Sequence, residues 1–163
     1  MGESDRAYEQ ALKYLERQER TELEVYNKLT GAGFPEESVT QALERLRDAG
    51  YVNDQSYAAR YMEALAKKGR GRLRIIEEMR RKGLDSDMIR NTLEDEALAA
   101  DETERAKDAA RKALDTIPEG TDSLKAMAKV NRRLRTLGYE YGTIGEAMNA
   151  LRSRDDNEEI DRE

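Results

Sequence analysis

The sequence contains no cysteine and no histidine, and these two absences exclude much of the side-chain chemistry that enzymes use. Without cysteine there is neither a disulfide framework nor a thiolate metal site. Without histidine the chain lacks the commonest general base, the commonest metal ligand and every Ser-His or Cys-His nucleophile arrangement. Carboxylates are plentiful, but no Walker or EF-hand spacing organises them. We therefore expect a protein that is not an enzyme and that needs no cofactor and no metal.

Aromatic and long apolar segments are also scarce. There is no tryptophan, there is one phenylalanine, and aromatic residues make up 6% of the chain, whereas charged residues make up 39%. No apolar run approaches the roughly 20 residues of a membrane span, and the N-terminal residues include no apolar signal-peptide stretch. The two prolines among many Ala, Leu, Glu, Arg and Lys favour helix almost throughout. These features indicate a cytoplasmic, helical protein with no membrane partner.

A pattern of one glycine and several aliphatic residues occurs three times, centred on Gly33, Gly83 and Gly138. Apolar residues stand ten, eight and four positions before each glycine, and six and ten positions after it. Spacings of four keep side chains on one helical face, so each copy is predicted to be a helix, a glycine turn and a second helix. The apolar residues are Leu23, Val25, Leu29, Val39 and Leu43; Leu73, Ile75, Met79, Ile89 and Leu93; and Ala128, Val130, Leu134, Ile144 and Met148.

Local signals agree with these helix ends. A glycine just past a helix adopts the left-handed conformation that other residues avoid. Thr21 with Glu24, and Thr143 with Glu146, match the capping-box pattern at a helix start. Asp54 is expected to cap the helix that follows it.

Each two-helix copy leaves one apolar face open, so each should recruit a preceding helix, at about 5–17, 55–67 and 98–115. The prediction is an all-α fold: an elongated, curved array of three tandem three-helix repeats. The repeats are expected at 1–53, 54–96 and 97–152, followed by a disordered acidic tail at 153–163.

The charge is segregated, although the net charge is −6. Residues 60–93 hold ten basic and five acidic residues, and residues 123–139 hold five basic and no acidic residues. Such blocks predict a basic face on the second and third repeats, whereas the acidic first repeat is expected to contact protein or to stay free of nucleic acid. The residues expected to contact a partner or DNA are Arg70, Arg72, Arg74, Arg80, Arg81, Lys82, Lys129, Arg132, Arg133 and Arg135.

Two interpretations of this basic face stay open. It can bind an extended polyanion or an acidic protein groove, or it can simply be the solvated surface that long helices need. Tyrosines are able to stack on bases, but at helical spacing most of them are expected in the core. These tyrosines are Tyr51, Tyr57, Tyr61, Tyr139 and Tyr141.

The order of these motifs resembles the RecX proteins, bacterial regulators of the RecA recombinase. Residues 17–23 (RQERTEL) lead to Leu29 and to Gly33-Phe34, as at the start of that family. Residues 50–61 (GYVNDQSYAARY), the segment from Lys68-Gly69 to Gly83-Leu84, and the stretch from Leu134 to Met148 follow in the family's order. The resemblance covers about residues 10–150.

The resemblance implies a non-catalytic, monomeric regulator whose partner is the RecA–DNA filament. Such a protein would bind in the filament groove, make at most weak contact with DNA, and restrain ATP hydrolysis and strand exchange in recombination, DNA repair and the SOS response. Two other functions fit the residues. One is an array of helix–turn–helix units that binds duplex DNA directly, and the other is a scaffold for a different helical partner, to which the basic blocks are irrelevant.

Overall fold

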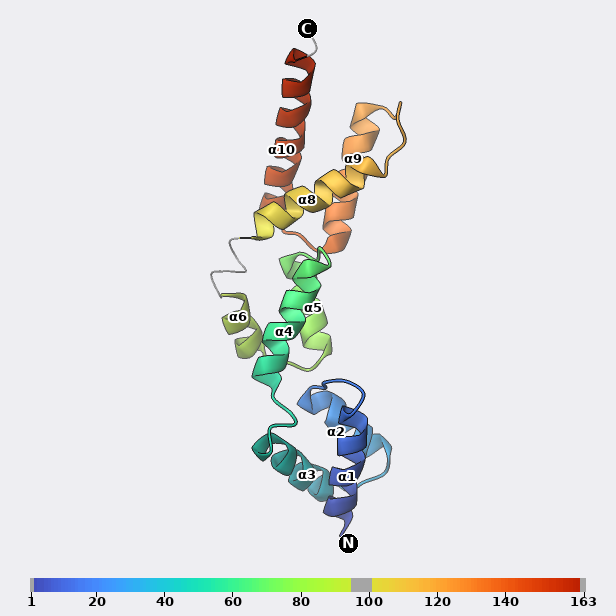
Figure 1. Ribbon diagram of the computed structural model, residues 1–163, viewed down its shortest axis with the longest axis vertical. Coiled ribbons are helices and arrows are strands. Elements are labelled where there is room, and N and C mark those ends of the chain that lie inside the picture. The colour runs from blue at the N-terminus through green and yellow to red at the C-terminus, as the bar shows by residue number, and fades with distance from the viewer. Residues whose placement is uncertain (1, 95–100, 162–163) are drawn as a thin grey trace. The chain divides into compact units, whose positions relative to one another are not determined.

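The computed structural model describes residues 2–94 and 101–161, and every regular element in these residues is an α-helix (Figure 1). This confirms the all-α prediction; the expected helical residues 98–100 lie outside the described residues. Contacts divide the chain into two units, which we call the first unit (1–61 with 78–92) and the second unit (62–77 with 93–163). The helices are α1 (Glu3–Leu15), α2 (Glu22–Gly31), α3 (Glu36–Asp48), α4 (Asp54–Lys67), α5 (Arg72–Arg81), α6 (Ser86–Leu93), α8 (Glu102–Asp115), α9 (Ser123–Leu137) and α10 (Tyr141–Ile160).

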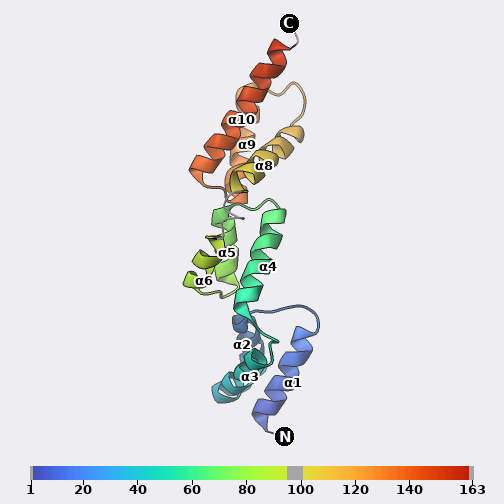
Figure 2. The same ribbon diagram turned by 60° about the vertical axis from the view of Figure 1, so that its left-hand side comes forward.

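Helices α1, α2 and α3 pack on one another in the first unit (Figure 2). Their core contains four of the five aliphatic residues predicted around Gly33, all except Leu23, and α1 adds Ala7 and Ala11, both fully buried. Alanines at these two positions, four apart, allow the backbone of α1 to approach closely. The Thr21–Glu24 capping box at the start of α2 is confirmed.

Helices α4, α5 and α6 bury four of the five residues that the second copy of the pattern predicts, Ile75, Met79, Ile89 and Leu93. The border between the two units crosses α4 and α5, so each of these helices contributes residues to both. The expected cap of α4 is wrong: the Ser56 N–H donates to Asn53 Oδ1 at 3.1 Å, whereas Asp54 is the first helical residue.

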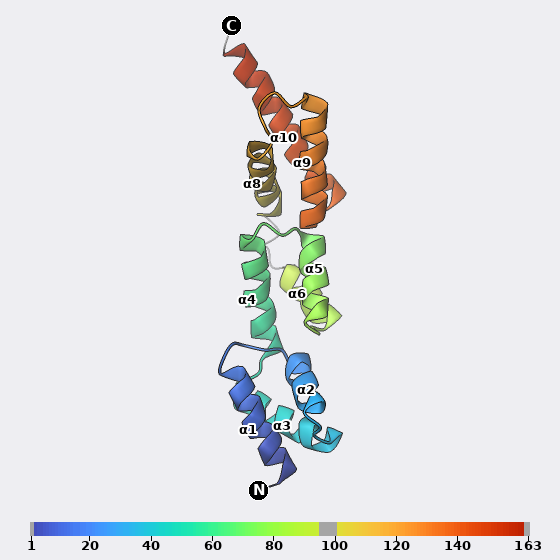
Figure 3. The ribbon, with the colours of Figure 1, turned by 90° about the vertical axis from the view of Figure 1, so that its right-hand side faces the viewer.

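Helices α8, α9 and α10 pack around a core in the second unit (Figure 3). The core includes the predicted Val130, Leu134, Ile144 and Met148, all buried. As in the first repeat, the first helix contributes alanines, Ala106 and Ala110, at full burial. Two of the repeats therefore use the same small-residue device to bring their first helix close to the other two.

The last helix differs from its prediction at both ends. Glu140 precedes the first residue of α10, so Thr143 lies inside the helix and the predicted Thr143–Glu146 capping box is wrong. At the other end α10 continues to Ile160, through most of the tail predicted to be disordered. Leu151 is the last buried residue and residues 152–160 are exposed. The extension follows from propagation, because adding residues to an existing helix is much easier than starting one.

The tyrosines divide between core and surface. Tyr57 and Tyr139 are buried and Tyr61 is half-buried, as expected of core residues. Tyr51 and Tyr141 are 54% and 94% exposed, so most of the five tyrosines, but not all, lie in the core. Tyr51 lies in the turn after α3, and Tyr141 begins α10 on the side away from the helices that pack against it.

The three repeat glycines share one backbone conformation but have different surroundings. Gly33, Gly83 and Gly138 have φ angles of 92°, 83° and 91°, in the left-handed region. A Cβ on Gly33 would meet no atom within 4 Å, whereas a Cβ on Gly138 would lie 2.5 Å from the Arg74 backbone nitrogen.

This contrast gives a matched pair of substitutions. We expect Gly33→Ala to lower the free energy of unfolding by about 1 kcal/mol, the cost of a side chain in the left-handed region. Gly138→Ala should cost about 2 kcal/mol more, because its neighbour is backbone that must shift. Urea unfolding followed by circular dichroism measures both, and equal costs would contradict the close approach at Gly138.

Candidate functional site

The start of α2 packs against the turn that ends α5, within the first unit. The Thr21 hydroxyl is buried and donates to the Lys82 carbonyl at 2.6 Å. The Glu22 N–H, one of the helix-start amides that has no partner inside its own helix, donates to Asp54 Oδ1 at 2.9 Å. The first two residues at this helix start therefore bind polar groups of the following repeat.

The start of α5 makes the corresponding contacts in the second unit. The Gly71 N–H donates to the Leu137 carbonyl at 2.8 Å, and the Arg72 N–H donates to Glu102 Oε1 at 2.9 Å. Lys82 and Leu137 each precede a repeat glycine, and Asp54 and Glu102 are each the first residue of a repeat's first helix. The same contact thus occurs twice, and we call it the inter-repeat joint.

Glycine permits the close approach at each joint. A Cβ on Gly83 would lie 2.4 Å from the side chain of Leu23, and a Cβ on Gly71 would lie 2.4 Å from the Tyr139 backbone nitrogen. Leu23 and Leu73 follow these helix starts and are 40% and 53% exposed, so the predicted core face does not extend to their positions. Ala128, their counterpart in the third copy, is exposed as well.

The joints engage two of the predicted partner-binding residues. Lys82 Nζ lies 3.5 Å from Glu24 Oε2, which Arg20 also approaches at 3.5 Å. Arg72 Nε lies 3.6 Å from Glu140 Oε1. Lys82 and Arg72 therefore place their charges beside carboxylates of the chain itself.

The other four partner-binding residues predicted between positions 70 and 82 are of two kinds. Arg74 and Arg81 lie 3.7 Å from Glu77 and Glu78, respectively, three residues away on the same helix. Such exposed helical pairs stabilise by about 0.2–0.5 kcal/mol and leave the arginines accessible. Arg70 and Arg80 make no ion pair with any carboxylate of the described residues.

The four basic residues predicted on α9 are exposed, and none forms an ion pair within the described part of the chain. They do not share one face of the helix. Lys129 and Arg133, one turn apart, face α8, whereas Arg132 and Arg135 border α10. On α9 the predicted basic face is therefore divided into two separate surfaces.

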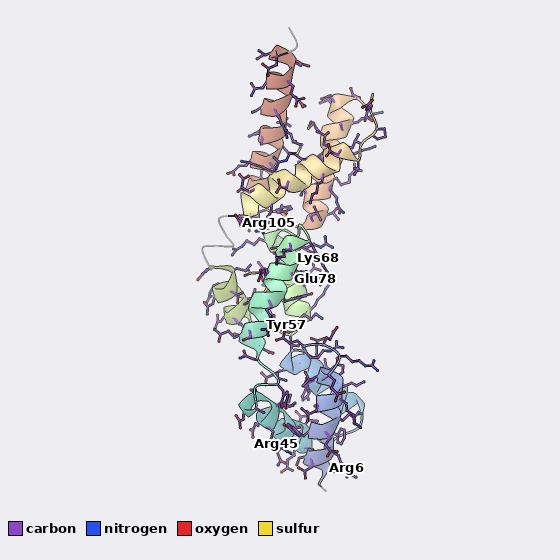
Figure 4. All side chains as sticks on the ribbon, in the orientation of Figure 1. Arg6, Arg45, Tyr57, Lys68, Glu78 and Arg105 are labelled. Atoms are coloured by element: carbon purple, nitrogen blue, oxygen red, sulfur yellow. The ribbon has the colours of Figure 1, made fainter. Side chains whose placement is uncertain are left out.

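The first surface is a cavity of about 550 Å³ within the second unit, which we call the α8–α9 cavity. Lys68, just after α4, and Arg105, on α8, both line it (Figure 4). Apolar residues including Ile117 and Leu137 form part of its wall. The charged residues that line it are Lys67, Lys68, Arg105, Lys112, Lys129 and Arg133, with Asp108 as the one acid.

The second surface is a groove of about 380 Å³, which we call the α9–α10 groove. Its residues are Leu124, Met127, Ala128, Asn131, Arg132, Arg135, Met148 and Arg152. Leu124 is 82% exposed, so the groove presents apolar surface between three guanidinium groups.

Neither a metal site nor a membrane-spanning helix is found in the described part of the chain. Among residues 2–94 and 101–161, no three carboxylates gather in a way that could hold a metal ion. No helix in those ranges combines the length and the apolar character needed to cross a bilayer.

Comparison with known proteins places the chain among proteins of related sequence and fold. The family model of the first three-helix domain of RecX matches residues 7–46, and that of the second matches residues 53–93. The regulatory protein RecX of Chlorobaculum tepidum is 32% identical over 149 residues, which are 90% of this chain and 89% of that protein. The chain belongs to the RecX family.

Other relatives extend the likeness. The regulatory protein RecX of Caldanaerobacter subterraneus is 28% identical over 147 residues, 90% of this chain and 71% of that protein. A crystal structure of RecX from Lactobacillus salivarius superposes with a TM-score of 0.79 at 25% identity, over 91% of this chain and 96% of that one. A second RecX crystal structure gives a TM-score of 0.80 at 27% identity, over 90% of this chain and 73% of that one.

The joint contacts yield one prediction for this RecX-family chain. Thr21→Val keeps the shape of the side chain but removes both the cap of α2 and the donor to the Lys82 carbonyl. The cap is worth about 1 kcal/mol, and loss of the hydrogen bond to the part-buried Lys82 carbonyl costs about 1–2 kcal/mol. We expect the free energy of unfolding to fall by about 2–3 kcal/mol. Thr21→Ser keeps the hydroxyl and serves as the control; a valine variant as stable as the serine variant would exclude the hydrogen bond.

A second prediction concerns Tyr57, which lies in the first unit (Figure 4). Burial, helped by the charge of Glu24, raises the pKa of Tyr57 to about 12 from 10.0. The unfolded chain therefore releases this proton first, and stability falls as the pH rises from about 10 to about 12. Tyr57→Phe should unfold at higher pH than the parent protein when an alkaline titration is followed by circular dichroism. The control is Tyr141→Phe, at a 94% exposed ring, which should leave the midpoint unchanged. Identical midpoints for the two variants would contradict the shift.

Proposed function

We propose that this protein binds RecA–DNA filaments, in their helical groove, and inhibits recombinase ATP hydrolysis and strand exchange. On this proposal it acts in the cytoplasm, in recombination, DNA repair and the SOS response, as a monomer and without a catalytic activity of its own. Membership of a family of regulatory proteins is the observation that supports this most directly.

The α9–α10 groove is the surface that we assign to the filament protein. Interfaces are enriched in arginine and methionine, and their centres exclude water around apolar anchors. Leu124 supplies exposed apolar area, and Arg132 and Arg135 have no carboxylate of the described chain to neutralise them. This combination suits a protein surface that carries both acidic and apolar side chains.

Tandem repeats support a polymer as the partner. A filament presents the same surface at regular intervals, and several weak contacts made by one chain add up to avidity. Arg70 and Arg80, which lack ion pairs in the described chain, are the residues of the second repeat that fit such additional contacts best. Lys82 and Arg72 are less suited, because a partner would compete with Glu24 and Glu140 for them.

The test is the ATPase rate of recombinase filaments on single-stranded DNA as this protein is titrated in. We expect inhibition at sub-stoichiometric protein, and we expect Arg132→Ser/Arg135→Ser to need at least tenfold more protein for half-inhibition. Lys13→Ser/Arg17→Ser removes the same charge from two exposed residues of the first repeat and should retain the parent potency.

Direct binding to DNA is the competing outcome. A parallel titration with bare DNA at several salt concentrations separates the two, because nucleic-acid binding through phosphates weakens steeply with salt. Tight, salt-dependent binding to bare DNA with an unchanged ATPase rate would refute the proposal in favour of a DNA-binding array.

A further inference from the structure

The α8–α9 cavity holds positive charge that the described chain does not neutralise. Lys68, Lys112, Lys129 and Arg133 are exposed and make no ion pair with a carboxylate of the described residues. Of the other charged residues of the lining, Lys67 lies 3.3 Å from Glu63, and Asp108 pairs with Arg111, which is not part of the lining. Four cations that have no ion-pair partner among the described residues therefore face one cavity.

Such a cluster is unfavourable without a counter-ion. Like charges that converge on one concave site repel one another, and low-dielectric walls strengthen the field there. A solvated helix face would not need its cations gathered from three segments. Here Lys68 comes from the turn after α4, Lys112 from α8, and Lys129 with Arg133 from α9.

The shape of the cavity limits the ligand that it fits. A volume of about 550 Å³ lies in the range of pockets that bury a small molecule. Ile117, Pro118 and Leu137 line it beside the cations, so it offers apolar wall as well as charge. A ligand with a chain of anionic groups and one compact ring would match both the positive charge and the apolar wall.

We propose that the α8–α9 cavity binds the phosphate chain of a nucleoside polyphosphate, with the cations on the phosphates and the nucleoside against the Ile117–Pro118 wall. Arginine binds phosphate through two parallel N–H groups, so Arg133 would fix the orientation of one phosphate, whereas the lysines act as point charges. The proposal is independent of the filament-binding function.

The residues that line the α8–α9 cavity also predict how strongly it discriminates between nucleotides. None of the lining residues of this cavity is aromatic, so a base has no ring to stack on. Recognition would then rest on the phosphates, and we expect ATP and GTP to bind within about threefold of each other, with tripolyphosphate competing for the site.

Isothermal titration calorimetry of the full chain, without recombinase or DNA, tests the proposal. The probes are ATP, GTP, inorganic tripolyphosphate and an oligothymidylate. One molecule of ATP should bind per chain, and Lys129→Ser/Arg133→Ser should weaken this binding at least tenfold. Arg132→Ser/Arg135→Ser removes the same charge from the other side of α9 and should retain the parent affinity.

A second double variant, Lys68→Ser/Lys112→Ser, takes its residues from other segments and should also weaken ATP at least tenfold, while circular dichroism verifies that each variant keeps its helix content. If oligothymidylate displaces ATP, the phosphates of nucleic acid are the source of the same chemistry; if it does not, the free nucleotide is. Absence of binding by all four probes, or equal weakening by the variants on the two sides of α9, would overturn the proposal. Because no filament is present, these outcomes are separate from those of the ATPase assay.

Discussion

The inter-repeat joint is the contact on which the rest of the arrangement depends. A helix start has amide groups without partners, and a helix end has carbonyls without partners, so placing one against the other resolves both. In this chain the Thr21 hydroxyl and the Gly71 N–H each reach the carbonyl that precedes a repeat glycine. Because the two elements approach closely, Gly83 and Gly138 each have two roles: they form the turn of their own repeat, and they leave room for the neighbouring helix start.

The joint also decides which charges remain available to a partner. Asp54, whose pKa burial raises, receives the Glu22 N–H, and Lys82 is held beside Glu24. In the sequence, the basic residues between positions 70 and 82 look alike. In the structure, some of them pair with carboxylates of the chain and others do not. The third repeat's α9 makes no such use of its basic residues within the described chain, and it becomes the stronger candidate surface.

The sequence predicted what depends on local spacing. Burial of Val25, Ile75 and Val130, and the left-handed glycines, follow from positions a few residues apart. It did not predict the joint, since Thr21 and Lys82 are separated by 61 residues and Asp54 has the same signature whether it caps its own helix or another one. The sequence singles out the basic residues as a class, but it does not show which of them form ion pairs or which neighbouring helix each one faces. Both depend on tertiary contacts that charge counts do not contain.

The two sides of α9 show why the direction in which each basic side chain points matters. Residues three or four positions apart lie on the same side of a helix. Lys129 and Arg133 therefore share one side of α9, and Arg132 and Arg135 share another. One side meets α8 and gathers cations around a concave, partly apolar cavity, whereas the other meets α10 and sets arginines around exposed Leu124. A concave cationic site suits a compact polyanion, and an open apolar groove suits a protein surface. A single basic helix can therefore present two chemically different surfaces, which the linear run of charges describes as one.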